Sequence, residues 1–359
     1  AGLIRVASLN NIEKIKNYEN MQAEDLALKL DVRYTTEGTL WKMGEMFQLS
    51  VELYDTQDRK IVWSDRWQEK WDNLPNIKNN LSDGLLKALD TSSKKETNIE
   101  KTNPEAYEFY LKAKHKYLKR VNKDDTEIVR QLLEKAIELD DNLIEAKLLF
   151  GLTYKGVGDY DKAMQIFIPA LKQAEERGDK LELANALNAI GLIYSEKHNY
   201  EKALDFYSRS LKIVEEVGEK YVMGSIFNNI GNIYNHKASY SKALNYFERS
   251  LNIKEELSDK VGIGNALNNI GLVNWYIGDL DKALGYFEKS LVIDEEVGDK
   301  SGMTSTLFNI GSINAHKGIY DKAIGYHKRA LLKKEELGDR PGIGYSFMLL
   351  GFVCFSKGD

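Results

Sequence analysis

The chain has 359 residues and a formal net charge of -5, from 50 lysines and arginines against 55 aspartates and glutamates. This mild acidity gives no reason to expect nucleic-acid binding, and no apolar run approaches the roughly 20 residues that a membrane-spanning helix needs. The single cysteine, Cys354, excludes an internal disulfide and favours a reducing compartment such as the cytoplasm. The sequence opens on the apolar run Leu3–Val6 without a Met and stops at a hairpin turn, so we expect a fragment of a longer protein.

Residues 1–90 predict a small α/β domain, and 91–103 predict a polar linker. Period-two alternation at 47–53 indicates a half-buried strand. The expected order is a strand at 4–8, a helix at 23–30, strands at 34–42, 47–53 and 61–67, and a helix at 74–89. Trp63, Trp67 and Trp71 gather at one edge of this sheet, and core packing is favoured over a ligand box.

From residue 143 onward the sequence repeats every 40 residues. Each copy predicts two amphipathic helices, for example at 183–197 and 201–217. We expect Gly191 and Ala203 to let two helix backbones approach closely, and stacked hairpins to form one core. The repeated positions are glycine at 151, 191, 231, 271, 311 and 351, alanine at 163, 203, 243, 283 and 323, and Phe167, Tyr207, Phe247, Phe287 or His327. Residues 104–142 look like one more, divergent unit.

This pattern resembles the tetratricopeptide repeat. Units such as Leu267–Gly271, Asp281–Leu284 and Glu295–Lys300 resemble the long repeats of kinesin light chains and of the LGN/Pins spindle adaptors. The resemblance covers residues 143–359, as five units and the first helix of a sixth. It implies a mostly α fold, a right-handed tetratricopeptide α-solenoid, preceded here by the small α/β domain.

The N-terminal stretch has a resemblance of its own. Leu30–Tyr34, Glu37–Thr39, Leu53–Asp55 and Trp63–Arg66 are similar to the TolB-amino-terminal-like domain, here partial because the family's leading strand and helix are missing. That domain commonly precedes tetratricopeptide repeats in bacterial adenylate and guanylate cyclases, some protein kinases and some winged-helix regulators. The resemblance implies a regulatory arm of a larger signalling protein. A free-standing adaptor with the same two domains is an equal alternative.

Neither a catalytic constellation nor a metal or cofactor site is expected. There is no phosphate-binding loop and no dinucleotide fingerprint. His236 and His316 share a register, but two repeats separate them by too much for a shared ion. An acidic ladder of glutamate pairs, from Glu175-Glu176 to Glu335-Glu336, could attract a basic partner, although a solvated outer edge is the favoured interpretation.

The asparagines give the sharpest functional signal. They recur in registers on the first helix of each hairpin, the helix that lines the concave surface in the tetratricopeptide family, and asparagine is a mediocre helix former. Two interpretations stay open: the amides hydrogen-bond between neighbouring repeats and hold the stack, or they grip the backbone of an extended peptide. The candidate groove residues are Asn188, Asn228, Asn229, Asn232, Asn235, His236, Asn268, Asn269, Trp275, Tyr276, Phe308, Asn309 and Ser312. These registers contain no lysine or arginine, which disfavours a clamp for peptide carboxylates.

The sequence therefore predicts a non-enzymatic binding module that uses the groove of its solenoid to hold a protein or peptide. The alternative is the regulatory C-terminal region of a bacterial class III adenylate or guanylate cyclase, or of a kinase. Neither nucleic acid nor membrane insertion is expected. Because the α/β domain lacks its leading strand, an open sheet edge could pair two copies into a homodimer.

Overall fold

The computed structural model describes residues 34–43, 46–55, 60–70, 103–119, 123–336 and 338–358. The chain divides into two compact units, residues 1–111 with 135–143 and residues 112–134 with 144–359. The expected strand at 4–8, the helices at 23–30 and 74–89, and Trp71 lie outside the described residues. No helix in the described ranges is long and apolar enough to cross a membrane.

The described part of the first unit contains a three-stranded antiparallel sheet in the order β1-β2-β3. The strands are β1 (Tyr34–Met43), β2 (Met46–Asp55) and β3 (Lys60–Lys70), so the three extended segments expected between 34 and 67 are confirmed. Val51 and Leu53 are buried and Glu52 is exposed, as period-two alternation requires. The rings of Trp63 and Trp67 lie 6.2 Å apart, which confirms that both point to one face of β3.

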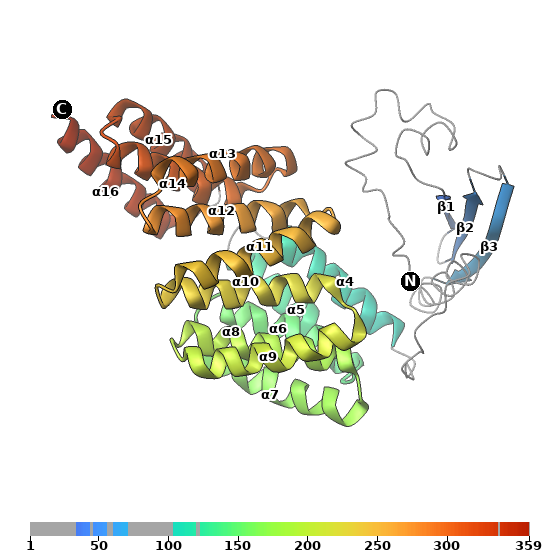
Figure 1. Ribbon diagram of the computed structural model, residues 1–359. Helices are drawn as coiled ribbons and strands as arrows, with labels where there is room; N and C mark the ends of the chain where they lie inside the picture. Colours follow the sequence, from blue (N-terminus) through green and yellow to red (C-terminus); the bar gives the residue numbers. More distant parts are fainter. Residues whose placement is uncertain are drawn as a thin grey trace. The chain divides into compact units, whose positions relative to one another are not determined.

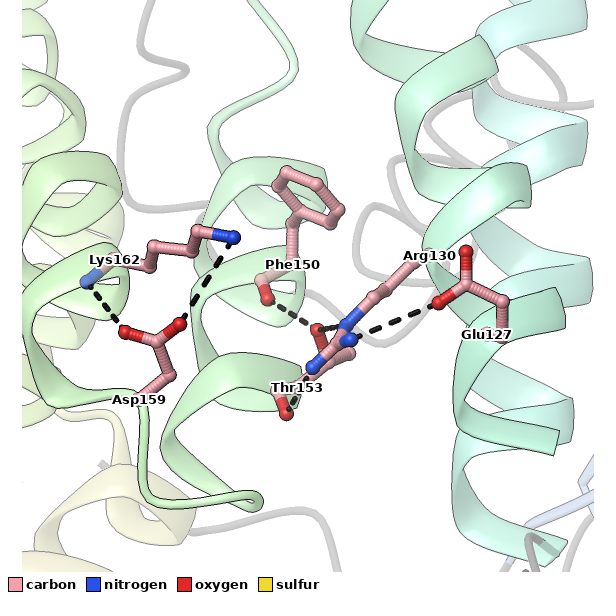
Figure 2. Close-up of polar contacts among 6 residues, drawn as sticks. All are labelled: Glu127, Arg130, Phe150, Thr153, Asp159 and Lys162. Carbon is pink, nitrogen blue, oxygen red and sulfur yellow. Dashed lines mark hydrogen bonds and ion pairs between the residues drawn. The ribbon is translucent and has the colours of Figure 1, made fainter. Parts of the chain in front are cut away.

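Residues 104–142 contain two helices, α4 (Pro104–Lys119) and α5 (Lys123–Leu139). Arg130 joins α5 to α6 (Ile144–Lys155), because its guanidinium donates to the hydroxyl of Thr153 at 3.0 Å and to the carbonyl of Thr153 at 3.1 Å. Figure 2 shows this contact, together with the bond from the Thr153 hydroxyl back to the carbonyl of Phe150. The divergent unit is thus tied to the regular repeats by a fixed polar contact.

The helices from α6 onward pair as successive hairpins, ordered by colour from green to red in Figure 1. In each hairpin the first helix contacts the second, and the second contacts the first helix of the next hairpin. The expected helices at 183–197 and 201–217 are confirmed as α8 and α9. The bounds are α7 Tyr160–Arg177, α8 Lys180–Glu196, α9 Tyr200–Val217, α10 Lys220–His236, α11 Tyr240–Glu256, α12 Lys260–Tyr276, α13 Leu280–Val297, α14 Lys300–His316, α15 Tyr320–Glu336 and α16 Arg340–Lys357.

A fixed set of residues begins and closes these helices. The side chain of Asp179 caps α8 by accepting from the backbone N–H of Glu182, and Asp299 accepts from the N–H groups of Ser301 and Gly302 at the start of α14. Glycine with positive φ follows several of the second helices, such as Gly178 after α7, where its N–H satisfies the last carbonyls, whereas Ser258 takes the positive φ after α11. The cap residues at the helix starts and ends therefore set the length of each helix, and with it the 40-residue period.

The repeated glycines make room for rings, which corrects the expected reason for their size. A Cβ atom built on Gly191 would lie 2.6 Å from the ring of Tyr207, and one on Gly231 would lie 2.7 Å from that of Phe247. The first helix thus accommodates an aromatic side chain of the second helix rather than its backbone. This ring register comprises Phe167, Tyr207, Phe247, Phe287 and His327, all of them buried.

Ion pairs 36 residues apart close the same end of four successive hairpins, from α8–α9 to α14–α15. Lys180 Nζ lies 3.0 Å from a Glu216 carboxylate oxygen, and Lys300 Nζ lies 3.0 Å from Glu336. The pairs Lys220–Glu256 and Lys260–Glu296 repeat this contact in the two hairpins between. Four of the ten glutamates of the acidic ladder are therefore paired with a lysine of the same hairpin in this way, as suits a solvated edge.

Candidate peptide-binding face

The candidate groove residues lie on the first helices α8, α10, α12 and α14. Each of these helices contacts the next one in the series, α8 with α10, α10 with α12 and α12 with α14. Second helices of neighbouring hairpins approach one another less closely, so the first helices form the inner face of the stack. This face collects side chains that are up to 124 residues apart in the sequence, from Asn188 to Ser312.

Six of the asparagines form three pairs between neighbouring repeats. In each pair the amide nitrogen of one repeat donates to the amide oxygen of the repeat before it, 41 residues earlier. All six are buried or half-buried. The bonds are Asn229 to Asn188 at 3.0 Å, Asn269 to Asn228 at 2.8 Å, and Asn309 to Asn268 at 3.0 Å. The first of the two interpretations, in which the asparagines hold the stack, thus has a direct geometric basis.

This pairing leaves hydrogen-bonding capacity on every amide. A side-chain amide offers two donors and an acceptor with two lone pairs, and each member of a pair uses one group. Within the described residues, the Asn188, Asn228 and Asn268 amide nitrogens donate to no other group. The pairing therefore fixes the orientation of the asparagines and leaves donors and acceptors unused. The asparagines can hold the stack and bind a peptide backbone at the same time.

Asn232 and Asn235 lie on the same helix, α10, and are half-buried. The amide oxygen of Asn235 is buried and has no hydrogen-bond partner among the described residues. A buried amide without a partner costs free energy, on the order of 1–3 kcal/mol. Asn235 therefore carries an unused acceptor within α10.

Two aromatic side chains end the first helices in stacked arrangements. The ring of His236 stacks on Tyr200 with centroids 5.9 Å apart, and Tyr276 stacks on Tyr240 at 6.1 Å. His236 and Tyr276 are exposed, Tyr276 at 57% of its surface. The stacking holds each ring in place while one face stays open, as a peptide anchor requires.

Trp275 and Phe308 both pack against neighbouring side chains. Trp275 is half-buried and packs against the core cluster around Phe287, so its position near the end of α12 does not leave the ring freely exposed. Phe308 packs edge-on against His327 and stacks on Tyr345, with centroids 5.6 Å away in each case. Both side chains support the stack as well as the face, because their rings are already partly desolvated. Ser312 is half-buried on α14.

Sequence reasoning missed a polar cavity of about 210 Å³ between α12, α13 and α14. Its wall includes Asn268 and the buried carboxylate of Asp294. The available signal was a carboxylate in a register that holds Ala174, Val214 and Lys254 in earlier repeats.

A second buried acid, Glu182, lies in an earlier repeat. Glu182, at the start of α8, is 8% exposed, and one of its carboxylate oxygens has no partner among the described residues. Burial, helped by the negative charges of Glu145 and Asp179, raises the pKa of Glu182 to about 8. Within the described residues no group of three His, Cys, Asp or Glu side chains could hold a metal ion.

Comparison with known proteins agrees with this architecture. A family model for the tetratricopeptide repeat matches residues 142–216 and 222–296. No curated protein matches the chain in sequence. Solved structures of similar fold include a signal transduction ATPase with a tetratricopeptide repeat sensor from Pyrococcus horikoshii, with 15% identity, a TM-score of 0.55 and coverage of 72% of this chain and 44% of that one.

Two further structures resemble the chain over most of their own length. A Rap protein complexed with competence and sporulation factor has 14% identity and a TM-score of 0.53, with coverage of 77% of this chain and 80% of that one. Aspartyl phosphate phosphatase F from Bacillus subtilis has 16% identity and a TM-score of 0.51, with coverage of 79% and 74%. The helical hairpins of this chain thus form an α-solenoid in which residues 142–216 and 222–296 match the tetratricopeptide repeat.

Proposed function

We propose that the solenoid is a scaffold that binds an extended, largely uncharged peptide segment along its first-helix face. One observation carries the proposal: the three asparagine pairs fix amides at regular intervals, and each amide keeps an unused donor or acceptor. An extended peptide presents backbone donors and acceptors that such amides can bind. The Rap protein with its bound competence and sporulation factor has the same fold. We extend that type of role to this chain.

The test is to select random peptides against the full chain and to map their site by substitution. Asn269→Ala and Tyr276→Ala are each expected to weaken binding by roughly 1–3 kcal/mol, the usual loss for an unpaired amide or an anchoring ring. Tyr276→Ala is the cleaner variant because this ring is mostly exposed. Trp275→Ala is expected to weaken binding by a similar amount, roughly 1–3 kcal/mol, and to lower the melting temperature as well.

Val292→Ala is the matched control, since Val292 is 65% exposed on the second helix α13. It should leave binding unchanged. Affinity should also depend weakly on salt, because the face has no cluster of one charge. Binders that lose affinity steeply with salt and compete through the acidic ladder would contradict the proposal and assign binding to that ladder.

The scaffold role implies that the chain does not itself catalyse a reaction. Purified chain should turn over neither ATP nor GTP above a buffer control. The single cysteine supports a cytoplasmic setting, and the 40-residue period supports the long-repeat type of tetratricopeptide array. Turnover that survives purification would contradict this part of the proposal.

The second candidate function is a regulatory region of a bacterial class III nucleotidyl cyclase or of a kinase. It rests on the sequence resemblance of residues 3–90 to the TolB-amino-terminal-like domain. The antiparallel strands β1, β2 and β3 fall at the strand positions expected from that stretch. The reading frame upstream of Ala1 in the gene distinguishes this candidate from a free-standing adaptor.

Self-association through the sheet is also proposed. In the described part of the first unit, β1 and β3 each pair on one side with β2. A strand with an open edge tends to pair with another chain. Light scattering should therefore show dimers that disappear when residues 1–90 are deleted. A strictly monomeric chain at high concentration would refute the idea.

A further inference from the structure

The polar cavity between α12, α13 and α14 opens beside the asparagine pairs. Its lining includes Asn265 and Asn268 from α12, Asp294 from α13, and Asp299, Ser305 and Thr306 from or next to α14. Asn268 also accepts the hydrogen bond of Asn309, so the cavity is continuous with the candidate peptide-binding face. Its volume of about 210 Å³ exceeds what a single water molecule needs.

A buried carboxylate without a countercharge lies in this cavity. Asp294 is 2% exposed. Its Oδ2 atom accepts a hydrogen bond from the hydroxyl of Thr306 at 3.0 Å, and the Ser290 hydroxyl lies 3.5 Å away. No lysine, arginine or histidine of the described residues pairs with it, and the charges that act on it most are those of Asp299 and Glu295. Burial and these two acids raise the pKa of Asp294 to about 6.

The two flanking repeats show how a lysine fills this space. The same register holds Lys254 one repeat earlier and Lys334 one repeat later. Lys254 is 6% exposed and its ammonium lies 2.9 Å from the cap residue Asp259. Its stem occupies the space beside Gly262, where a Cβ atom would lie 2.6 Å from Lys254 Cδ.

Lys334 makes the equivalent arrangement at the start of α16. Its ammonium donates to the carbonyl of Gly342 at 3.2 Å, and a Cβ atom on Gly342 would lie 2.9 Å from Lys334 Cδ. In both repeats a lysine stem lies over a glycine near the helix start and its charge is satisfied there.

The middle repeat keeps the glycine and the cap but lacks the lysine. Gly302 and Asp299 occupy the positions of Gly262 and Asp259, whereas the lysine is replaced by the shorter, oppositely charged Asp294. The helix N-terminus cannot serve an anion, because the N–H groups of Ser301 and Gly302 already donate to Asp299 at 3.0 Å. The Asp294 carboxylate lies over Gly302, where a Cβ atom would lie 2.7 Å from Asp294 Oδ1, so this cavity presents a carboxylate where both flanking repeats present a lysine.

We propose that this cavity binds the ammonium group of a lysine side chain of the bound peptide. The inference rests on the proposed peptide-binding function and adds one specificity determinant to it. The ammonium would form a charge-assisted hydrogen bond to Asp294, while Ser305 and Asn265 offer further acceptors. A peptide that is otherwise uncharged would then be placed in register by one lysine.

The first test uses n-butylammonium chloride, which has the stem and charge of a lysine side chain, with the full chain observed by NMR. We expect saturable shifts of the backbone amide signals of residues 301–306, and none with n-butanol or sodium chloride at equal concentration. Asp294→Asn should abolish the response. Asp205→Asn is the matched control, because it removes a carboxylate from an exposed position on the second helix α9.

The second test selects random peptides on the wild-type chain and on Asp294→Lys. Binders to the wild type should share a lysine whose replacement by norleucine weakens affinity by roughly tenfold or more, the loss expected for a bond to a charged group. Replacing the lysine of the peptide by norleucine should have little effect on its affinity for the Asp294→Asn variant. Asp294→Lys should raise the melting temperature, because its own stem fills the cavity and its charge meets Asp299, and it should remove the lysine preference.

The outcomes separate this inference from the peptide-binding proposal. Peptides that bind through the asparagines without any lysine preference, together with no butylammonium response, would overturn the lysine site and leave the groove proposal standing. An Asp294-dependent butylammonium response without any selected peptide would support the site and overturn the groove. A response that Asp294→Asn leaves intact would overturn the site.

Discussion

In the middle of each hairpin, a glycine of the first helix lies under an aromatic ring of the second helix. Near the C-terminal end of the second helix, by contrast, the residue at one register changes from repeat to repeat. The first region is the ring register, from Phe167 to His327. The second, the end register, reads Ala174, Val214, Lys254, Asp294 and Lys334. Uniform packing thus sets how hairpins stack, and the variable end leaves room for individual chemistry such as the Asp294 cavity.

The largest effect is expected in the middle of a hairpin. Phe247→Ala should lower the free energy of unfolding by about 3–5 kcal/mol, because the ring is fully buried and the glycine opposite leaves a cavity that cannot close. Urea unfolding followed by circular dichroism measures this. Phe352→Ala, at a ring 65% exposed on α16, should change little. Equal losses in both variants would break the comparison.

At the variable end, Glu182→Gln should stabilise the chain above neutral pH. The folded-state pKa of about 8 lies above the usual 4.5, so folding favours the protonated acid. Stability is therefore lost as pH rises from about 4.5 to 8, and the neutral amide avoids a loss on the order of 1–3 kcal/mol. Melting temperatures between pH 5 and 9 should separate progressively. Glu248→Gln, at an exposed site on α11, should show no such trend.

His327→Phe tests the one position of the ring register that holds a titratable side chain. Burial lowers the pKa of His327, with a smaller contribution from Lys334, so the protonated form is disfavoured in the folded chain. The stability of the native protein should therefore fall as pH drops below the unfolded-state pKa of about 6.5. The phenylalanine variant should gain about 1–2 kcal/mol at pH 5 and less at pH 8. A gain that does not depend on pH would contradict a neutral, buried imidazole.

Tyr207→Phe should be neutral or stabilising by up to about 1 kcal/mol, since the Tyr207 hydroxyl is buried without a partner among the described residues. Phe167, Phe247 and Phe287 fill the same register, so the smaller ring fits without rearrangement. Thermal unfolding of the two chains measures the difference. A clear loss of stability would show that the hydroxyl has a partner, such as an ordered water molecule.

The smallest effect is expected for the ion pairs that close the hairpins. Lys220→Ala should cost less than about 1 kcal/mol, because the Glu256 side chain is largely solvated and surface pairs contribute little. The cost should shrink further at high salt. A double-mutant cycle with Glu256→Gln measures the coupling. A coupling comparable to the loss in Phe247→Ala would mean that charge, rather than packing, sets the stack.

Periodicity was enough to predict the helical part of the fold. Glycine and ring recur at fixed spacing because each hairpin solves the same packing problem, so one copy explains the others. The reason assigned to Gly191 was wrong, since a one-letter pattern does not show that Tyr207 enters from the second helix. Whether the asparagines bond to one another was left open, because their spacing is the same in both interpretations.

The Asp294 cavity could not be predicted by the same argument. A comparison of repeats finds the residues that recur, whereas the cavity exists because the residue type at position 294 differs from those at the same position in the other repeats. The half-burial of Trp275 was missed for a related reason: its position on the helix was known, but the cluster against which it packs comes from a different helix. The local sequence pattern predicts which face of a helix a side chain lies on. How deeply that side chain is buried depends on the neighbouring helices of the assembled stack.

The asparagine bonds, the ring packing and the lysine–glutamate pairs all recur with the period of the repeat. Excising one 40-residue period therefore joins two surfaces that already match, and duplicating one inserts a unit that both neighbours accept. Unequal recombination within such a gene can lengthen or shorten the array without designing a new interface. A position such as Asp294 would move along the array with its repeat, so the spacing between binding determinants is itself open to selection.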